Sequence, residues 1–265
     1  MATLLRADLF KLRKRALGWV MLIIMALFVP LQMLPSAFVS PGNVNYGFPN
    51  GLLEGLAPLP FVGTLIMIIL GALLIGSEYS YDTWKNMLTR RAGRVPFILS
   101  KVLVLVVATV IGLTVLLPLG QLVGLILQST LPLHGPVVSI SPGSALLLIL
   151  TQALLPLVAG FIALMGAVIG RSSVAGIVIG IAWFLVDALL GGLFPALSLS
   201  NATVFLQAQW SGFTVASSGS ISPAHLGAIS GPMALVPALI VGIYLVVPII
   251  VAAIVFRQRD MLGAS

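Results

Sequence analysis

Long apolar runs alternate with short polar segments along the whole chain. An apolar helix needs about 20 residues to cross the hydrocarbon core of a bilayer. The pattern predicts an all-α integral membrane protein whose six transmembrane helices form a single transmembrane domain over residues 1–265. The predicted spans lie near residues 17–38, 59–77, 102–127, 144–169, 174–194 and 233–256.

The composition supports a membrane protein over a soluble one. Hydrophobic residues make up 60% of the chain and charged residues only 7%, whereas soluble domains carry about 25% charged residues. A formal net charge of +7 could indicate nucleic-acid binding in a soluble protein. Here the basic residues flank the apolar runs, so we expect the lipid bilayer, and no nucleic acid, as their partner.

Lysine and arginine fall on one side of the predicted membrane. All 13 lie before span one, between spans two and three or four and five, or after span six. The loops near 39–58, 128–143 and 195–232 contain none. Because cytoplasmic loops retain basic residues, we predict that both termini are cytoplasmic and that these three loops face outward.

Several common kinds of active site have no counterpart in this sequence. The chain has no cysteine, no phosphate-binding pattern G-x-x-x-x-G-K-[ST] and no G-x-S-x-G nucleophile motif. Its two histidines, His134 and His225, fall in different outward loops. We therefore expect that this chain has no metal site and no ATPase site of its own, and that it is not an enzyme.

Small residues recur at a spacing of four within three spans, where helix backbones can approach closely. We expect ordinary packing within one subunit from these pairs rather than dimerisation. They are Gly120 and Gly124, Gly166 and Gly170, and Gly176 and Gly180.

The N-terminal segment, residues 1–16, can form an interfacial helix with leucines on one face and charges elsewhere. The alternative is that its bases only anchor and orient the first span. These bases are Arg6, Lys11, Arg13, Lys14 and Arg15.

The longest connection on the basic side runs from Gly76 to Lys101 and mixes acids, aromatics and bases. We predict a helix from about Tyr79 to Leu88, a basic turn, and a new helix near Pro96. A solvated loop that obeys only the positive-inside rule is the alternative. It would leave Glu78, Tyr79, Asp82 and Trp84 without a role.

Three segments together resemble the permease subunits of type-2 ABC exporters, in the drug, bacteriocin and peptide-antibiotic export branch. They are the opening Leu-Arg-Ala-Asp-Leu-Phe-Lys-Leu-Arg-Lys-Arg, the stretch Ser77-Glu-Tyr-Ser-Tyr-Asp-Thr-Trp-Lys with Leu88-Thr-Arg and Lys101, and the turn Gly170-Arg-Ser-Ser-Val-Ala-Gly. The chain departs from the family pattern at Asp8, where Glu is common, and at Asp82, where Gly is common.

The resemblance implies a permease in a bacterial or archaeal plasma membrane that exports a hydrophobic or amphipathic compound. A second permease copy would pair with it as a homodimer, and two separate ABC ATPase subunits would complete a 2+2 complex. These subunits would hold ATP and Mg, with no cofactor in this chain. The segment between spans two and three would be a cytoplasmic coupling helix. The implied coupling residues are Glu78, Tyr79, Ser80, Tyr81, Asp82, Thr83, Trp84, Lys85 and Arg171.

Asp187 is the acid placed well inside a predicted span. A charged Asp at the centre of a membrane helix costs about 2.5–3.5 kcal/mol on insertion scales, so it needs a polar cavity, a partner or a proton. One interpretation is a polar contact on the substrate path. The other is a hydrogen-bonded structural residue at a helix break.

Two other functions remain open on the sequence. An ATP-independent carrier or channel would be expected to show paired charges within the membrane or repeated halves, and neither is evident. A membrane scaffold that transports nothing would need no elaborate connection between spans two and three.

Overall fold

The computed structural model describes most of the chain, and most of the described residues belong to helices. The described residues are 6–8, 10–11, 14, 16–39, 41–42, 44–80, 94–135, 139–194, 197–211, 213–215, 221–223 and 235–258.

Within the described ranges, six helices are long and apolar enough to cross a membrane, which confirms the predicted fold class. They are α2 (Ala16–Val39), the segment Asn50–Ser80, α6 (Arg94–Thr130), α7 (Pro142–Gly170), α8 (Ser173–Leu193) and α10 (Leu235–Gln258). The second of them is built from three parts. These are the short helix α3 (Asn50–Glu54), a π-helical turn η1 (Leu59–Gly63) and the helix α4 (Thr64–Ser80).

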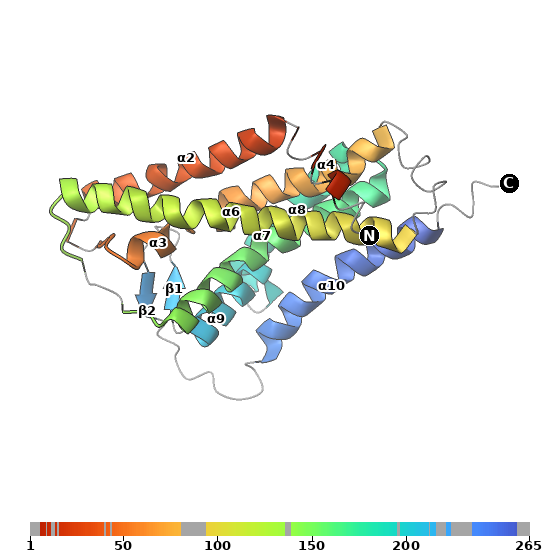
Figure 1. Cartoon of the computed structure of the whole chain (residues 1–265). Coiled ribbons are helices and arrows are strands. Elements are labelled where there is room, and N and C mark those ends of the chain that lie inside the picture. Colours follow the sequence, from red (N-terminus) through yellow and green to blue (C-terminus); the bar gives the residue numbers. More distant parts are fainter. Residues whose placement is uncertain are drawn as a thin grey trace.

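The start of α6 and the end of α10 lie at one end of the bundle, and α3 and the two short strands lie at the other (Figure 1). We call these the basic end and the neutral end. The described lysines lie at the basic end, whereas the loops at the neutral end contain no Lys or Arg.

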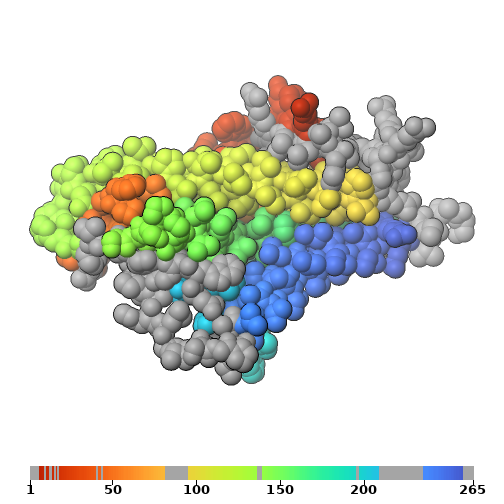
Figure 2. Space-filling view, turned by 60° about the horizontal axis from the view of Figure 1, so that its bottom comes forward, coloured from red at the N-terminus to blue at the C-terminus, as the bar shows by residue number. Residues whose placement is uncertain are grey.

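The helices α4 and α7 form the centre of the bundle. In each of their spans, 61% of the most apolar 18-residue window is buried, against 22% or less in the other four. Large apolar side chains on the outer helices are exposed instead, for example Leu27 on α2 and Leu239 on α10. Figure 2 shows α6 and α10 side by side along one face. Such apolar outer faces are typical of helices in contact with lipid.

Glycine pairs bring backbones together inside the subunit, as the sequence predicted. A Cβ added to Gly55, the residue after α3, would lie 2.9 Å from Gly120 Cα of α6, and Gly124 faces Gly51 of α3 in the same way. At the centre, a Cβ on Gly71 of α4 would clash with the carbonyl oxygen of Gly160 on α7. Only glycine permits backbone contacts this close.

The neutral end is more structured than a set of loops. The segment near 39–58 was predicted to be an outward loop, but it contains α3, in which Leu53 and Glu54 are buried. Tyr46 is fully buried beside it, donates to Met33 O (3.0 Å) and receives a contact from Ser36 Oγ (2.7 Å). Burial raises the pKa of the Tyr46 phenol above its ordinary value of 10.0.

A further helix, α9 (Leu199–Ser211), packs against α7, α8 and α10. It is followed by a small antiparallel ribbon of β1 (Phe213–Val215) and β2 (Ile221–Pro223), in which Thr214 pairs with Ser222. The composition of the outward segment 195–232 permits either short helices or a plain loop, and the structure has a helix at Leu199–Ser211.

Candidate coupling site

Four charged side chains form a chain of contacts at the basic end. Lys101 Nζ lies 2.7 Å from Asp8 Oδ1 and 3.3 Å from Glu78 Oε1, and Lys11 Nζ lies 2.9 Å from the same Glu78 oxygen. Ser100 Oγ adds a contact of 3.3 Å to the other oxygen of Asp8. We call Asp8, Lys11, Glu78 and Lys101 the ionic cluster.

Most of this cluster is shielded from solvent. The side chain of Lys101 is 1% exposed and those of Asp8 and Glu78 are 5% exposed, while Lys11 at the rim is 41% exposed. Among the described residues, two formal positive and two formal negative charges of the cluster contact one another. A buried charge needs such a partner, and removing one partner of a buried pair costs about 3–5 kcal/mol.

The cluster joins segments that are far apart in the sequence. Asp8 and Lys11 belong to the N-terminal segment, Glu78 stands two residues before the end of α4, and Lys101 lies in the first turns of α6. Lys101 Nζ also lies 5.0 Å from the centre of the Phe97 ring, which stacks on Phe256 of α10 at 5.5 Å. Four elements therefore meet around Lys101.

Residues 81–93 lie between α4 and α6, outside the described residues. The predicted coupling residues Tyr81, Asp82, Thr83, Trp84 and Lys85 fall there, and so does most of the predicted helix from Tyr79 to Leu88. The contact between Glu78 and Lys101 joins the elements on either side of this segment. Of the remaining predicted residues, Tyr79 packs against the core around Phe97, and Ser80 is exposed.

The turn between α7 and α8 packs beside the end of α4. Arg171 is exposed and takes a left-handed backbone conformation (φ 51°), and Ser172 Oγ caps α8 by accepting from Val174 N at 3.1 Å. A Cβ on Gly76 would clash with Ser173 Cα. The structure therefore brings the Arg171 turn close to the α4 end that carries Glu78.

The predicted interfacial bases have different surroundings. Arg6 and Lys14 are exposed, with Lys14 Nζ 5.6 Å above the ring of Phe10, whereas Lys11 belongs to the ionic cluster. The described residues between 6 and 14 are helical, as predicted. Arg13 and Arg15 lie outside the described residues.

Asp187 does not join the ionic cluster. It is 2% exposed and accepts hydrogen bonds from the backbone N–H groups of Leu199 (2.6 Å) and Ser200 (3.1 Å), at the start of α9. Free N–H groups at a helix start are usually satisfied in this way by an acidic or hydroxyl side chain. This geometry matches the structural interpretation of Asp187.

Two members of the cluster were not among the predicted site residues. Asp8 and Lys101 both lie in segments that carry the family resemblance, but 93 positions separate them. Their only sequence signal is that each is a charged residue beside an apolar run. That signal does not reveal their pairing.

A family model described as ABC-2 family transporter protein matches residues 4–187, more than half of the chain. The chain belongs to the ABC-2 transporter family. The match begins before Asp8, includes the whole ionic cluster and the Arg171 turn, and ends at Asp187. No curated protein matches the chain.

Membership of the ABC-2 family has direct consequences for this chain. Its permeases are multi-pass membrane components of transporters and carry no ATPase site of their own. They work in general with an ABC ATPase subunit. The six apolar helices and the family together identify a transmembrane permease.

Proposed function

We propose that this chain is the permease of an ATP-driven exporter that moves a hydrophobic or amphipathic compound, such as a peptide antibiotic or a drug, outward. A separate ABC ATPase binds ATP and Mg and supplies the energy. Two permease copies pair, and the complex lies in a bacterial or archaeal plasma membrane with both permease termini in the cytoplasm.

The observation that carries this proposal is the ionic cluster. Lys101 holds the start of α6 to the end of α4 through Glu78, and to the N-terminal segment through Asp8. A force applied to the segment between α4 and α6 would therefore move both helices and the N-terminal segment together. A membrane anchor alone requires no such linkage.

This geometry refines the role of Glu78. Its carboxylate is buried and already accepts from Lys11 and Lys101, so we assign it to positioning the coupling segment rather than to direct contact with the ATPase. We assign direct contact with the ATPase to the residues from Tyr81 to Lys85 and to the exposed Arg171.

The test is transport by the purified complex. The chain is co-expressed with a candidate ABC ATPase subunit, reconstituted in vesicles, and assayed with a panel of fluorescent amphipathic peptides. We expect uptake that requires ATP and is lost when the catalytic glutamate of the ATPase is replaced. Uptake that persists without ATP would favour a carrier or channel, and an ATPase that never assembles with the chain would favour a scaffold.

A further inference from the structure

A polar cavity of about 220 Å³ lies among η1, α2, α7 and α9 toward the neutral end. Its polar lining consists of amides and hydroxyls, contributed by Gln32, Thr151, Gln152, Ser200, Thr203 and Gln207. None of the described residues that line it is ionisable. Since about 10–15 Å³ is enough to hold one water molecule, the cavity has room for a ligand group of several atoms.

Gln152 is the residue that points to a ligand. It is 7% exposed, and its side-chain amide has no hydrogen-bond partner among the described residues. A buried amide needs partners for both its N–H groups and its carbonyl oxygen. The hydroxyl of Thr203 donates to Ser200 O (2.8 Å) within α9, so its oxygen can still accept from a ligand.

An apolar cavity of about 240 Å³ adjoins the polar one and shares Gln32, Ala57 and Phe61 with it. Its other lining residues are Phe28, Leu31, Pro58 and Val62. Leu31 and Phe61 are each 59% exposed, so this half opens at the surface of the chain. Apolar side chains make up most of the surface of both cavities, and the amides and hydroxyls are concentrated in the inner one.

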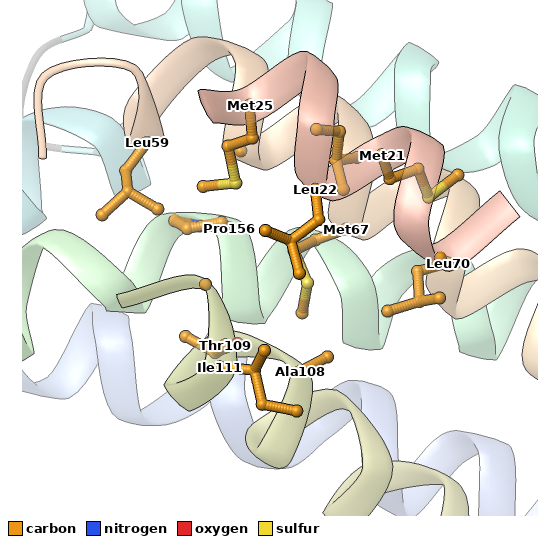
Figure 3. Close-up of a pocket in the computed structure, with 14 residues that line it drawn as sticks. Met21, Leu22, Met25, Leu59, Met67, Leu70, Ala108, Thr109, Ile111 and Pro156 are labelled. Carbon is orange, nitrogen blue, oxygen red and sulfur yellow. The ribbon is translucent and has the colours of Figure 1, made fainter. Parts of the chain in front are cut away.

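A third cavity shows what a purely apolar site in this chain looks like. It measures about 80 Å³ and lies between α2, α4, α6 and α7, with methionine side chains from α2 and α4 pointing into it (Figure 3). Its lining includes Met21, Met25, Met67 and Pro156. It shares no lining residue with the polar cavity. From η1, Leu59 lines this third cavity and Phe61 lines the polar cavity.

Asp187 helps to hold the polar cavity in shape. Its carboxylate fixes the start of α9, and α9 supplies Ser200, Thr203 and Gln207 to the cavity wall. Asp187 itself does not line the cavity, so its charge is not presented to a ligand.

We propose that the joined polar and apolar cavities bind an uncharged amphiphile. Its amide or hydroxyl group bonds to Gln152 and the neighbouring amides and hydroxyls, and its apolar part lies against Phe28, Leu31 and Phe61. The absence of ionisable lining residues selects against a charged group, because a buried charge without a counter-charge is strongly unfavourable. The binding step stands by itself, and only the further step, that such an amphiphile is the transported compound, rests on the proposed function.

The experiment measures binding to the purified full-length permease in lipid nanodiscs, without ATP or ATPase. Since the chain has no cysteine, Leu34→Cys can carry a fluorescent bimane one helical turn from Leu31. The probe is a nitroxide joined to an octyl chain by an amide, and nitroxides quench bimane at close range. The comparison probe replaces the amide with a quaternary ammonium group.

We expect saturable quenching by the amide probe, and a half-saturating concentration for the ammonium probe that is higher by on the order of tenfold. Gln152→Leu raises the half-saturating concentration of the amide probe by roughly tenfold, and the isosteric Thr203→Val raises it by roughly threefold. Gln121→Leu is the matched control, since the amide of Gln121 is buried without a partner among the described residues but lies outside this cavity. It leaves binding unchanged.

Competition identifies where the amphiphile comes from. Displacement of the amide probe by dioleoylglycerol added to the nanodisc supports a membrane lipid with a free hydroxyl, and its failure to compete supports a dissolved amphiphile. Quenching that never saturates, or that is equal for both probes, would overturn the proposal. So would binding that neither Gln152→Leu nor Thr203→Val weakens in folded protein. Because no ATPase is present, either result is separate from a failure of the transport assay.

Discussion

Lys101 Nζ of α6 lies 2.7 Å from Asp8 Oδ1 of the N-terminal segment, with both side chains at least 95% buried. The same Nζ lies 3.3 Å from Glu78 of α4, so a single cation holds three segments together. The family identifies a transporter permease, and in the proposed function this cluster is where a mechanical signal from the ATPase reaches the membrane helices.

Charge balance in the ionic cluster can be tested by a double substitution. Lys101→Met leaves Asp8 and Glu78 buried with one fewer positive charge, and we expect it to destabilise the permease by about 3–5 kcal/mol. Asp8→Asn together with Lys101→Met restores the balance and is expected to recover at least half of that loss. Unfolding of the purified chain in detergent measures both, and additive effects of the two substitutions would contradict direct coupling.

The role of Asp187 as a cap for α9 predicts a graded response. Asp187→Asn keeps one acceptor oxygen for Leu199 N or Ser200 N and is expected to cost about 1 kcal/mol, whereas Asp187→Leu removes both acceptors and costs about 2–3 kcal/mol. The measurement is hydrogen exchange of the α9 backbone. The control is Leu189→Ala, an exposed position on α8, the helix that carries Asp187. Unchanged protection of α9 in Asp187→Leu would contradict the capping role.

The contact of α4 with α7 requires glycine at position 71. Gly71→Ala places a methyl group against Gly160 O and is expected to lower the unfolding temperature or prevent assembly of the bundle. Gly242→Ala is the matched control in α10, since an added Cβ there meets nothing within 4 Å. Equal effects of the two substitutions would contradict the close backbone contact.

Orientation in the membrane can be read from single cysteines, since the native chain has none. Ser129 at the neutral end and Ser80 at the basic end are both exposed. In intact cells, a membrane-impermeant thiol reagent is expected to label Ser129→Cys and not Ser80→Cys. The reverse pattern would invert the proposed topology.

The spans could be predicted from the sequence because membrane helices depend on a local property, a sustained apolar run. The apolar pattern does not predict helix lengths and contacts that depend on tertiary packing. A new helix was predicted near Pro96 and α6 begins at Arg94, but the apolar run placed span three only at 102–127, whereas the 37 residues of α6 form one continuous helix of about 55 Å. The extra turns lie at the basic end and carry Lys101 to its partners.

Glu54 shows a second limit. It was left in an outward loop because the apolar run begins after it, but glycine contacts between α3 and α6 draw this segment into the bundle, where Glu54 is 4% exposed. The partners of Asp187 could not be predicted either. They are backbone N–H groups at the start of α9, and the composition of this segment does not require a helix there. Gln152 was missed because a single glutamine in an apolar run carries no signal of a cavity.

The central claim, that the ionic cluster links an ATPase to the membrane helices, is tested most directly by the ratio of transport to ATP hydrolysis. The measurement is ATP-dependent peptide uptake and ATP hydrolysis in the same vesicles, for complexes with wild-type permease, Glu78→Ala and the exposed control Ser80→Ala. A coupling free energy of 1–3 kcal/mol corresponds to about 5–150-fold, so we predict that Glu78→Ala lowers uptake per ATP by at least about fivefold. Because loss of a buried ion partner destabilises the permease by about 3–5 kcal/mol, the ratio is compared only in assembled complexes, where basal hydrolysis is expected to stay near the wild-type value and Ser80→Ala is expected to resemble wild type. An unchanged ratio in a fully assembled Glu78→Ala complex would contradict the account.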